Sequence, residues 1–366
     1  MASRHSGGAS GRRHQSRLVR ASLAIILPLV PASLASASID NQWALRYLQA
    51  DKVWGVTRGS GIEVAVVDTG VQMNVDVSSN LLRGADFSDP SGINAGSGHL
   101  DRDGYGHGTG EATIIGGSGM KTLGLAPDSS ILPVRATDGS DNGLIFGVAP
   151  GINFAVAQKA RVINLALGYE HDDPDIHRAV QDALDHDVVV VAAVGNDGSS
   201  QQYYPAAWPG VVGVGAIDSS GAVWSQSNSG ADVALVAPGV HILRDDNQGR
   251  VGYSDGTSEA TAYVSAAAAL VRSAHPRWTA VQVVAALEST ADKPAAMRGA
   301  VRDDRYGAGI LDVLAAVRLA EPPVVGGPAA VAARGAGGGW GWLVVGGGAA
   351  GVCLIFLGVW WRVRRG

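Results

Sequence analysis

The chain has 366 residues, of which 46% are hydrophobic and 17% are charged, and its formal net charge at pH 7 is -5. This length allows one large domain or two ordinary ones, with ample apolar material for a core. The mildly acidic charge, without a Lys/Arg-rich run in the central region, argues against a nucleic-acid-binding protein. A single cysteine, Cys353, excludes an intramolecular disulfide framework.

Residues 1–37 have the pattern of a secretory signal peptide. Residues 1–20 are rich in arginine and lack acidic residues, and the apolar run at 21–34 ends in Ala-Ser-Ala. We predict cleavage after Ala37. An uncleaved anchor is the alternative, but two prolines interrupt a run that is already short for spanning a bilayer. A twin-arginine signal is less well supported, because the paired arginines are not directly followed by the apolar run.

The C-terminal residues have the pattern of a membrane anchor. Residues 321–339 are rich in Pro, Gly and Ala, which is typical of a flexible linker. Residues 340–361 carry no charge, are long enough to cross about 30 Å of hydrocarbon as a helix, and have tryptophans at both ends. The positive-inside rule places the basic tail at 362–366 in the cytoplasm and the preceding domain outside. A buried core helix is the alternative, but the many glycines in this run would weaken a soluble helix.

The globular part begins with a short N-terminal segment and a strand. Residues 38–60 contain an apolar pattern too short for a domain, and we expect them to pack along the domain surface. Residues 61–70 predict a strand whose near-continuous apolar run ends in Asp68. A buried parallel strand of this kind delivers a carboxylate to the sheet edge where ligands and catalytic groups tend to lie.

A histidine between glycines follows in a long polar loop. The glycines leave the imidazole of His107 uncrowded, and residues 109–115 can continue as a helix. Residues 101–104 resemble the start of a calcium loop, but no acidic residue closes it at the required spacing, so we predict no metal. The glycine-rich run at 116–122 has Met120 where a phosphate loop needs glycine.

Apolar runs then alternate with helical patterns. Strands are expected at 130–135, 162–167, 188–194, 211–217 and 233–237. Helices are expected at 145–159, 176–185, 258–272 and 279–289. This alternation predicts an α/β fold with a mostly parallel sheet and helices on both faces, in one domain over residues 61–320.

A glycine, two hydroxyls and a run of small apolar residues surround Ser258. We expect a tight turn that opens a buried helix. The helix N-terminus would place free N–H groups and a positive dipole end beside Ser258 Oγ, which suits a nucleophile. Gly-Thr-Ser alone also fits an ordinary N-cap.

Asp68, His107 and Ser258 occur in the chain order known for subtilisin. Their contexts, Val-Val-Asp-Thr-Gly, Gly-His-Gly-Thr and Gly-Thr-Ser-x-Ala, resemble those of the subtilisin-like serine proteases. Further matches lie at 124–127, 160–165 and 193–196. The resemblance implies that Ser258 attacks a carbonyl carbon, His107 transfers the proton and Asp68 fixes the imidazole tautomer.

The same resemblance implies the remaining parts of a protease site. Asn196 matches the family's side-chain oxyanion donor, with the N–H of Ser258 as its partner, although a Gly-Asn-Asp-Gly turn would also explain this residue. Ala166, Leu167 and Gly168 stand where the family commonly has the Ser-Leu-Gly segment that lines the substrate cleft. Backbone binding of an extended peptide is therefore expected, and no cofactor is implied.

The order of segments is similar to that of the mycosins, the membrane-anchored proteases associated with type VII secretion in actinobacteria. The resemblance implies an extracytoplasmic serine endopeptidase on the cell membrane, with peptide substrates and a secretion complex as partners. Only about 25 residues separate Ala37 from the first strand, which is too short for an independently stable prodomain. The alternative is a structural component of a secretion complex in which proteolysis is secondary.

Four residues depart from the family pattern: Gly110, Ala166, Glu259 and Ala262. The cysteine pairs that mycosins commonly carry are also absent from the domain. Glu259 directly follows the nucleophile. Its carboxylate either opposes the charge that develops on the oxyanion or turns to solvent. The first possibility predicts an enzyme that is slow at neutral pH or inactive.

Overall fold

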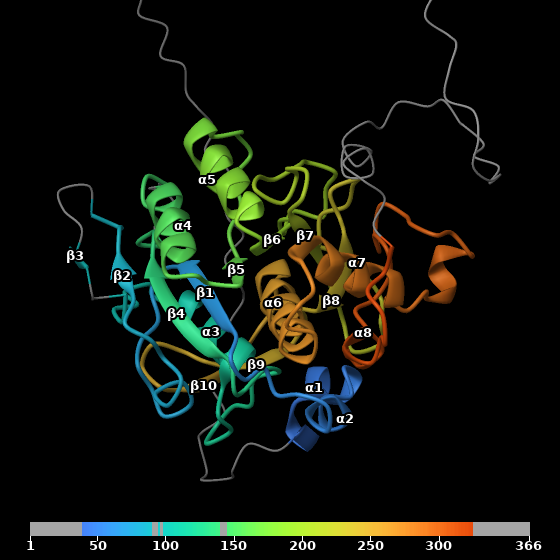
Figure 1. Cartoon of the computed structure of the whole chain (residues 1–366), viewed down its shortest axis with the longest axis horizontal. Helices are drawn as coiled ribbons and strands as arrows, with labels where there is room; N and C mark the ends of the chain where they lie inside the picture. Colours follow the sequence, from blue (N-terminus) through green and yellow to red (C-terminus); the bar gives the residue numbers. More distant parts are fainter. Residues whose placement is uncertain (1–38, 90–93, 96–97, 140–144, 325–366) are drawn as a thin grey trace, which may run out of the picture. The chain divides into compact units, whose positions relative to one another are not determined.

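An eight-stranded sheet forms the centre of the protein (Figure 1). The computed structural model describes residues 39–89, 94–95, 98–139 and 145–324. The strand order is β3-β2-β4-β1-β5-β6-β7-β8, and all strands are parallel except β3, which runs antiparallel to β2. The strands are β1 (Glu63–Asp68), β2 (Ala85–Asp86), β3 (Asn94–Ala95), β4 (Ser130–Arg135), β5 (Val162–Leu165), β6 (Val189–Ala193), β7 (Val212–Ile217) and β8 (Leu235–Pro238). The mostly parallel α/β sheet expected from the alternating pattern is confirmed.

Helices cover both faces of this sheet. The longer ones are α3 (His107–Gly116), α4 (Val148–Ala157), α5 (Pro174–Asp185), α6 (Thr257–Ala274) and α7 (Ala280–Thr290), and the short ones are η1 (Ile39–Asn41), α1 (Trp43–Tyr47), α2 (Ala50–Trp54), η2 (Ala295–Met297) and α8 (Val313–Val317). Successive β1 side chains point to opposite faces, as the period of a strand requires. Val64 and Val66 join the core under α3 and α6, whereas Ala65 and Val67 join the core under α4 and α5.

Helix α6 is the most deeply buried helix of the domain. Its residues from Thr257 to Arg272 are all buried, and many are alanines, so the backbone lies close to β5, β6 and β7. Small, mostly apolar side chains on every face of a helix are typical of a helix enclosed by the core. The first turn of α6, which carries Ser258, is therefore held firmly at the carboxyl edge of the sheet.

The N-terminal segment packs along the domain surface, as the sequence predicted. Trp43 donates through Nε1 to the carbonyl oxygen of Val240 at 3.0 Å, and Trp54 donates to that of Leu125 at 2.9 Å. Both indole N–H groups thus find partners while the rings cover apolar surface. The segment therefore contacts two parts of the domain that lie far apart in sequence.

A two-stranded hairpin was not predicted from the sequence. It consists of β9 (Ile242–Asp245) and β10 (Val251–Ser254) and packs against α3. Its pattern gave no signal because β9 buries two charged residues, Arg244 and Asp245, where a strand of a core usually has apolar side chains.

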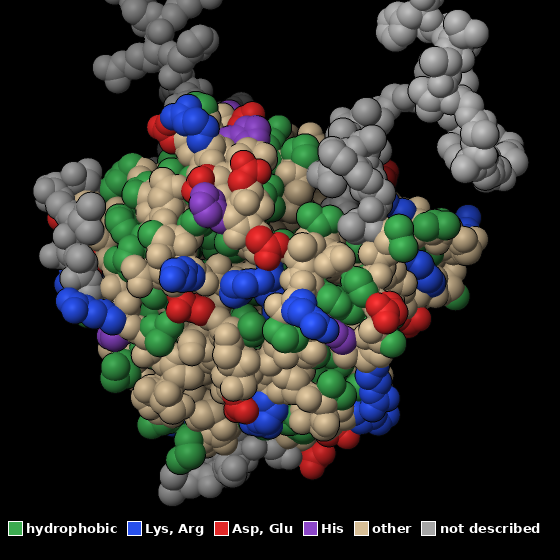
Figure 2. Space-filling view, in the orientation of Figure 1, with side chains coloured by type: hydrophobic (Ala, Val, Ile, Leu, Met, Phe, Trp, Pro, Cys, Tyr) green, Lys and Arg blue, Asp and Glu red, His purple; other side chains and the backbone are tan. Residues whose placement is uncertain are grey.

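Both terminal predictions, the signal peptide and the anchor at 340–361, lie outside the described residues. Among the residues that the structure describes, no helix has the length and apolar character to cross a membrane. Lys/Arg and Asp/Glu side chains are interspersed over the face seen in Figure 2.

Candidate active site

Three loops that follow neighbouring parallel strands build the site at one edge of the sheet. Asp68 ends β1, Ala166 directly follows β5, and Asn196 lies just after β6. Because the carboxyl ends of parallel strands meet at one edge, these residues come together although more than a hundred positions separate the first from the last.

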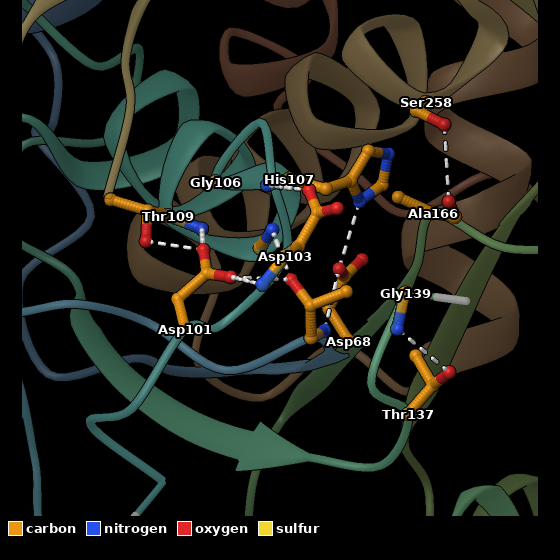
Figure 3. Close-up of polar contacts among 12 residues, drawn as sticks. Asp68, Asp101, Asp103, Gly106, His107, Thr109, Thr137, Gly139, Ala166 and Ser258 are labelled. Carbon is orange, nitrogen blue, oxygen red and sulfur yellow. Dashed lines mark hydrogen bonds and ion pairs between the residues drawn. The ribbon is translucent and has the colours of Figure 1, made fainter. Parts of the chain in front are cut away.

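Asp68 and His107 form the first half of the predicted triad. Asp68 is 1% exposed, and its Oδ1 lies 2.8 Å from His107 Nδ1 and accepts the backbone N–H of Thr69 at 2.7 Å. A buried carboxylate beside Nδ1 requires the proton on that nitrogen and leaves Nε2 as the ring's basic atom. Figure 3 shows the imidazole with its Nδ1 directed to Asp68 and its opposite edge on the Ser258 side.

His107 is the first residue of α3, which begins two residues before the expected helix start at 109. Its backbone N–H donates to Asp103 Oδ2 at 2.9 Å, which caps the start of the helix. Gly106 precedes it in the left-handed region with φ of 67°, and a Cβ there would meet the backbone nitrogen of Asn247 at 2.2 Å. Only glycine fits this position, so the sequence around His107 sets the direction of the imidazole.

A buried carboxylate clamps β1 to α3 beneath the histidine. Asp101, which is 5% exposed, accepts hydrogen bonds from Thr69 Oγ1 at 3.0 Å, Thr109 N at 3.0 Å and Thr109 Oγ1 at 2.6 Å (Figure 3). The segment that resembled a calcium loop therefore uses its first carboxylate on protein donors. Among the described residues, no group of three or more His, Cys, Asp or Glu is arranged to hold a metal ion.

Ser258 lies in the first turn of α6 and is 9% exposed. Its Oγ donates to the carbonyl oxygen of Ala166 at 3.0 Å, and within the described part of the chain no hydrogen bond joins it to His107. Catalytic hydrogen bonds are often formed only when substrate is bound, so Ser258 remains a candidate nucleophile.

Asn196 is held with its amide nitrogen available. Its Oδ1 accepts from Thr257 N at 2.9 Å and from Thr257 Oγ1 at 2.8 Å. Nδ2 lies 3.6 Å from the place where a Cβ on Gly256 would stand, beside the N-terminus of α6. The amide N–H groups therefore face the region next to the Ser258 backbone, where an oxyanion donor is needed.

Thr257 was treated in the sequence only as a capping residue. In the structure, Gly256 is the N-cap of α6. Thr257 orients Asn196, and its Oγ1 accepts a hydrogen bond from Gly195 N at 3.3 Å. The hydroxyl beside Ser258 in Gly-Thr-Ser was the available signal for this role.

The expected substrate segment is placed next to the serine. Ala166 is buried, whereas Leu167 and Gly168 are partly exposed. The following residue, Tyr169, pairs through its backbone with Tyr204, each N–H donating to the other's carbonyl oxygen at 2.8 Å. This pairing holds one end of the segment and leaves Leu167 and Gly168 at the surface beside Ser258.

The charges around the imidazole raise its pKa. Burial lowers the pKa of His107, but the charge and hydrogen bond of Asp68 outweigh it, and the charges of Glu111 and Glu259 add to the increase, to about 10. Glu111 was not singled out in the sequence, although it lies on α3 only one turn beyond the histidine. The imidazole therefore keeps its second proton up to a pH well above neutral.

The solvent-facing alternative for Glu259 is wrong. Glu259 is 2% exposed, its Oε1 accepts from Ser254 Oγ at 2.5 Å, and it lies 3.7 Å from Arg244 Nε. The carboxylate is turned inward because a buried guanidinium on β9 balances its charge. No sequence signal pointed to Arg244, since it is brought to Glu259 by the unpredicted hairpin.

These features define an α/β serine hydrolase: an aspartate-oriented histidine, a serine at a helix N-terminus and an amide donor, all at the carboxyl edge of a parallel sheet. The sequence profile of the subtilase family, peptidase S8, matches residues 59–309, so the chain belongs to that family of serine proteases. The predicted resemblance to subtilisin-like proteases is thereby confirmed.

Known proteases are similar over much of the chain. The thermophilic serine proteinase of Bacillus sp. (strain AK1) is 36% identical over 258 residues, which cover 69% of this chain and 62% of that protein. The chain thus spans less than two thirds of that relative's length. Subtilisin BL of Lederbergia lenta is 34% identical over 282 residues, which cover 75% of this chain and 98% of that protein.

Among solved structures, the serine protease MycP1 is similar in fold. Its structure has a TM-score of 0.67 and 29% sequence identity, and the alignment covers 80% of this chain and 92% of that one. That protein is described as an essential component of the type VII (ESX-1) secretion system.

Proposed function

We propose that this protein is an extracytoplasmic serine endopeptidase, held at the cell membrane by residues 340–361, that hydrolyses peptide bonds through an acyl-enzyme. The observation that carries the proteolytic part is the geometry of the triad. His107 is bonded to Asp68 at 2.8 Å, and Ser258 lies in the first turn of α6 beside a free amide donor of Asn196. The uncharged, tryptophan-flanked run supports the anchor.

The mechanism follows from the hydrogen-bonding capacity of each group. A bound peptide extends along Leu167 and Gly168 through backbone hydrogen bonds. Ser258 Oγ leaves Ala166, passes its proton to His107 Nε2 and attacks the carbonyl carbon, while Asp68 stabilises the imidazolium.

Negative charge then develops on the carbonyl oxygen of the peptide. Asn196 Nδ2 and the Ser258 N–H donate to that oxygen, and loss of one such donor typically costs about 100- to 1000-fold in rate. His107 returns the proton to the leaving amine, and water hydrolyses the acyl-enzyme by the same route. Thr257 supports this step because its two hydrogen bonds hold Asn196 Oδ1 away from the oxyanion.

We infer further that the protease works with a type VII secretion complex. The fold similarity to MycP1, the predicted signal peptide and the predicted single anchor support this association. A second candidate function is a structural role in such a complex. It is favoured by the description of MycP1 as an essential component of the secretion system.

Labelling with a fluorophosphonate probe tests the proteolytic function without knowledge of the substrate. We expect the probe to modify Ser258 in the wild type and to leave Ser258→Ala unlabelled. Ser265→Ala is the matched control, because Ser265 lies on the same helix but donates to Asn164 instead of facing the site. A wild-type protein that stays unlabelled at every pH would exclude an active protease.

An experiment in cells distinguishes the proteolytic role from the structural role in secretion. In a strain that carries only Ser258→Ala, we expect the export of secretion substrates or their processing to change. Unchanged export and processing in this strain would assign the function to the scaffold instead.

A further inference from the structure

Three charged side chains lie buried behind the triad and take no part in the mechanism described above. Arg244 is 4% exposed, Glu259 is 2% exposed and Glu111 is 0% exposed. They come from β9, α6 and α3, and no sequence motif joins the three positions. Burial of charges is costly unless they are paired, so this cluster calls for a physical explanation.

The contacts of Arg244 reach both halves of the catalytic apparatus. On one side, its Nη1 donates to the carbonyl oxygen of Gly106 at 3.1 Å and to that of Tyr105 at 3.4 Å. These two residues directly precede His107. On the other side, its Nε donates to Ser254 Oγ at 2.7 Å.

Ser254 passes this contact on to the nucleophile's neighbour. Its Oγ donates to Oε1 of Glu259, which also lies 3.7 Å from Arg244 Nε. Glu259 directly follows Ser258. One guanidinium thus joins the backbone in front of the base to the residue behind the nucleophile.

Gly110 on α3 makes room for this guanidinium. A Cβ at Gly110 would stand 2.3 Å from Arg244 Nη1 and 2.4 Å from its Cδ. Any side chain there would push Arg244 away from the Gly106 carbonyl. Gly110 and Glu259, two of the positions that depart from the family pattern, therefore belong to one arrangement with Arg244 at its centre.

We propose that Arg244 is a positioning residue for the triad, which ties the backbone of His107 to Glu259 and so sets the placement of the imidazole relative to Ser258. The proposal rests on the proposed proteolytic function. No Ser258–His107 hydrogen bond is made within the described residues, so the backbones that carry the two side chains determine their approach. A misplacement of about 1 Å can cost about 100-fold in rate.

The test measures the rate of fluorophosphonate labelling of Ser258 at a pH where this rate no longer rises with pH. The unfolding midpoint is measured as well. Arg244→Met alone leaves the carboxylate of Glu259 buried without its cation, so the decisive protein is the double variant Arg244→Met/Glu259→Met. Exchange of a buried ion pair for apolar side chains of similar volume is often neutral in stability. We expect the double variant to unfold near the wild-type midpoint and to be labelled about 10- to 100-fold more slowly.

Two further variants keep the test decisive if the double variant does not fold. Arg244→Lys retains a cation near Glu259 but loses the Nη1 donor to Gly106, and we expect slower labelling with little change in unfolding. Arg250→Met is the matched control, because Arg250 forms an exposed ion pair with Asp246 in the same hairpin, with its Nε 2.6 Å from Oδ2. It should label like the wild type.

Wild-type labelling rates in Arg244→Lys, or in a folded double variant, would overturn the positioning role. That result differs from a failure of the proposed function, in which the wild type itself is not labelled. A purely structural role of Arg244 would lower the unfolding midpoint and leave the labelling rate of the folded fraction unchanged.

Discussion

Two buried polar clusters flank the catalytic histidine, and they solve the burial of a carboxylate in different ways. In front of α3, Asp101 accepts hydrogen bonds from the hydroxyl and amide donors of Thr69 and Thr109, and no Lys or Arg of the described residues forms an ion pair with it. Behind α3, Glu259 lies beside the guanidinium of Arg244, and Glu111 has no hydrogen-bond partner for either oxygen among the described residues. The first cluster lies within residues 69–109, whereas the second joins Glu111 to residues more than a hundred positions later in the chain.

The difference shows which cluster can influence the chemistry. Burial raises the pKa of Asp101, and the hydrogen bonds from Thr109 oppose this increase. The charges of Glu111 and Glu259 raise the pKa of His107, whereas the side chain of Asp101 bonds Thr69, Thr109 and the Asp103 backbone and, among the described residues, makes no hydrogen bond to the imidazole. We therefore interpret the Asp101 cluster as a clamp and the Arg244–Glu259–Glu111 cluster as the part that tunes the base.

The largest expected effect is on the pH dependence of labelling. The folded-state pKa of His107 is raised from 6.5 to about 10, and the imidazole is a base only when it is neutral. The labelling rate should then rise about tenfold per pH unit from neutral pH towards pH 10. The charged groups that act on the ring are Asp68, Glu111 and Glu259, while Asp103 bonds the His107 backbone and Arg244 the Gly106 carbonyl.

Substitutions in the two clusters sharpen this test. Glu259→Gln should move the rising limb of the profile to lower pH because it removes a negative charge, whereas Asp101→Asn should move it less. Equal shifts in the two variants would contradict the division between clamp and tuning cluster. A profile that is already flat at neutral pH would contradict the prediction that the enzyme is slow there.

Removal of one member of the ion pair should have the next largest effect. Glu259→Met leaves the guanidinium of Arg244 buried without its carboxylate, which typically costs about 3–5 kcal/mol of stability. Urea unfolding measures this loss. The double variant with Arg244→Met should recover most of it, and a double variant as unstable as the single one would argue against the pairing.

The clamp should be somewhat less sensitive. Asp101→Ala strands the buried donors of Thr69 and Thr109, which should lower the free energy of unfolding by about 2–3 kcal/mol. Asp101→Asn keeps one acceptor oxygen and should lose less. If both variants unfolded like the wild type in urea, the hydrogen bonds of the clamp would contribute nothing measurable.

The smallest effect is expected at Glu111. Burial, followed by the charge of Glu259, raises the pKa of Glu111 well above 4.5. A carboxyl group whose pKa is higher in the folded state favours folding at acidic pH, and this contribution is lost as the pH rises through the folded-state value.

Glu111→Leu should therefore stabilise the protein by about 1 kcal/mol at neutral pH, because it removes a buried polar group that has no partner. The gain should be smaller near pH 4. A gain that did not change with pH would indicate that Glu111 does not titrate in this range, and unfolding curves at the two pH values distinguish these outcomes.

Much of the fold was readable because it depends on local pattern. The strand at 130–135 is found as predicted, and the other predicted strands and helices of the sheet region end within a few residues of their expected limits. Continuous apolar runs predict buried parallel strands, and the run of small residues after Ser258 predicts an enclosed helix. The hairpin of β9 and β10 was not predicted, because the buried charged residues of β9 interrupt the apolar pattern of a strand.

The sequence by itself determined the class of fold and the family, and it predicted the site residues Asp68, His107, Ser258 and Asn196, since each stands in a local context that a short motif describes. Only the tertiary structure decided that Thr257 orients Asn196 and that Glu259 is turned inward beside Arg244. The physical reason is distance along the chain. A strand end or a helix start is specified by its neighbours, whereas the partner of a buried charge is specified by whichever element folding brings against it.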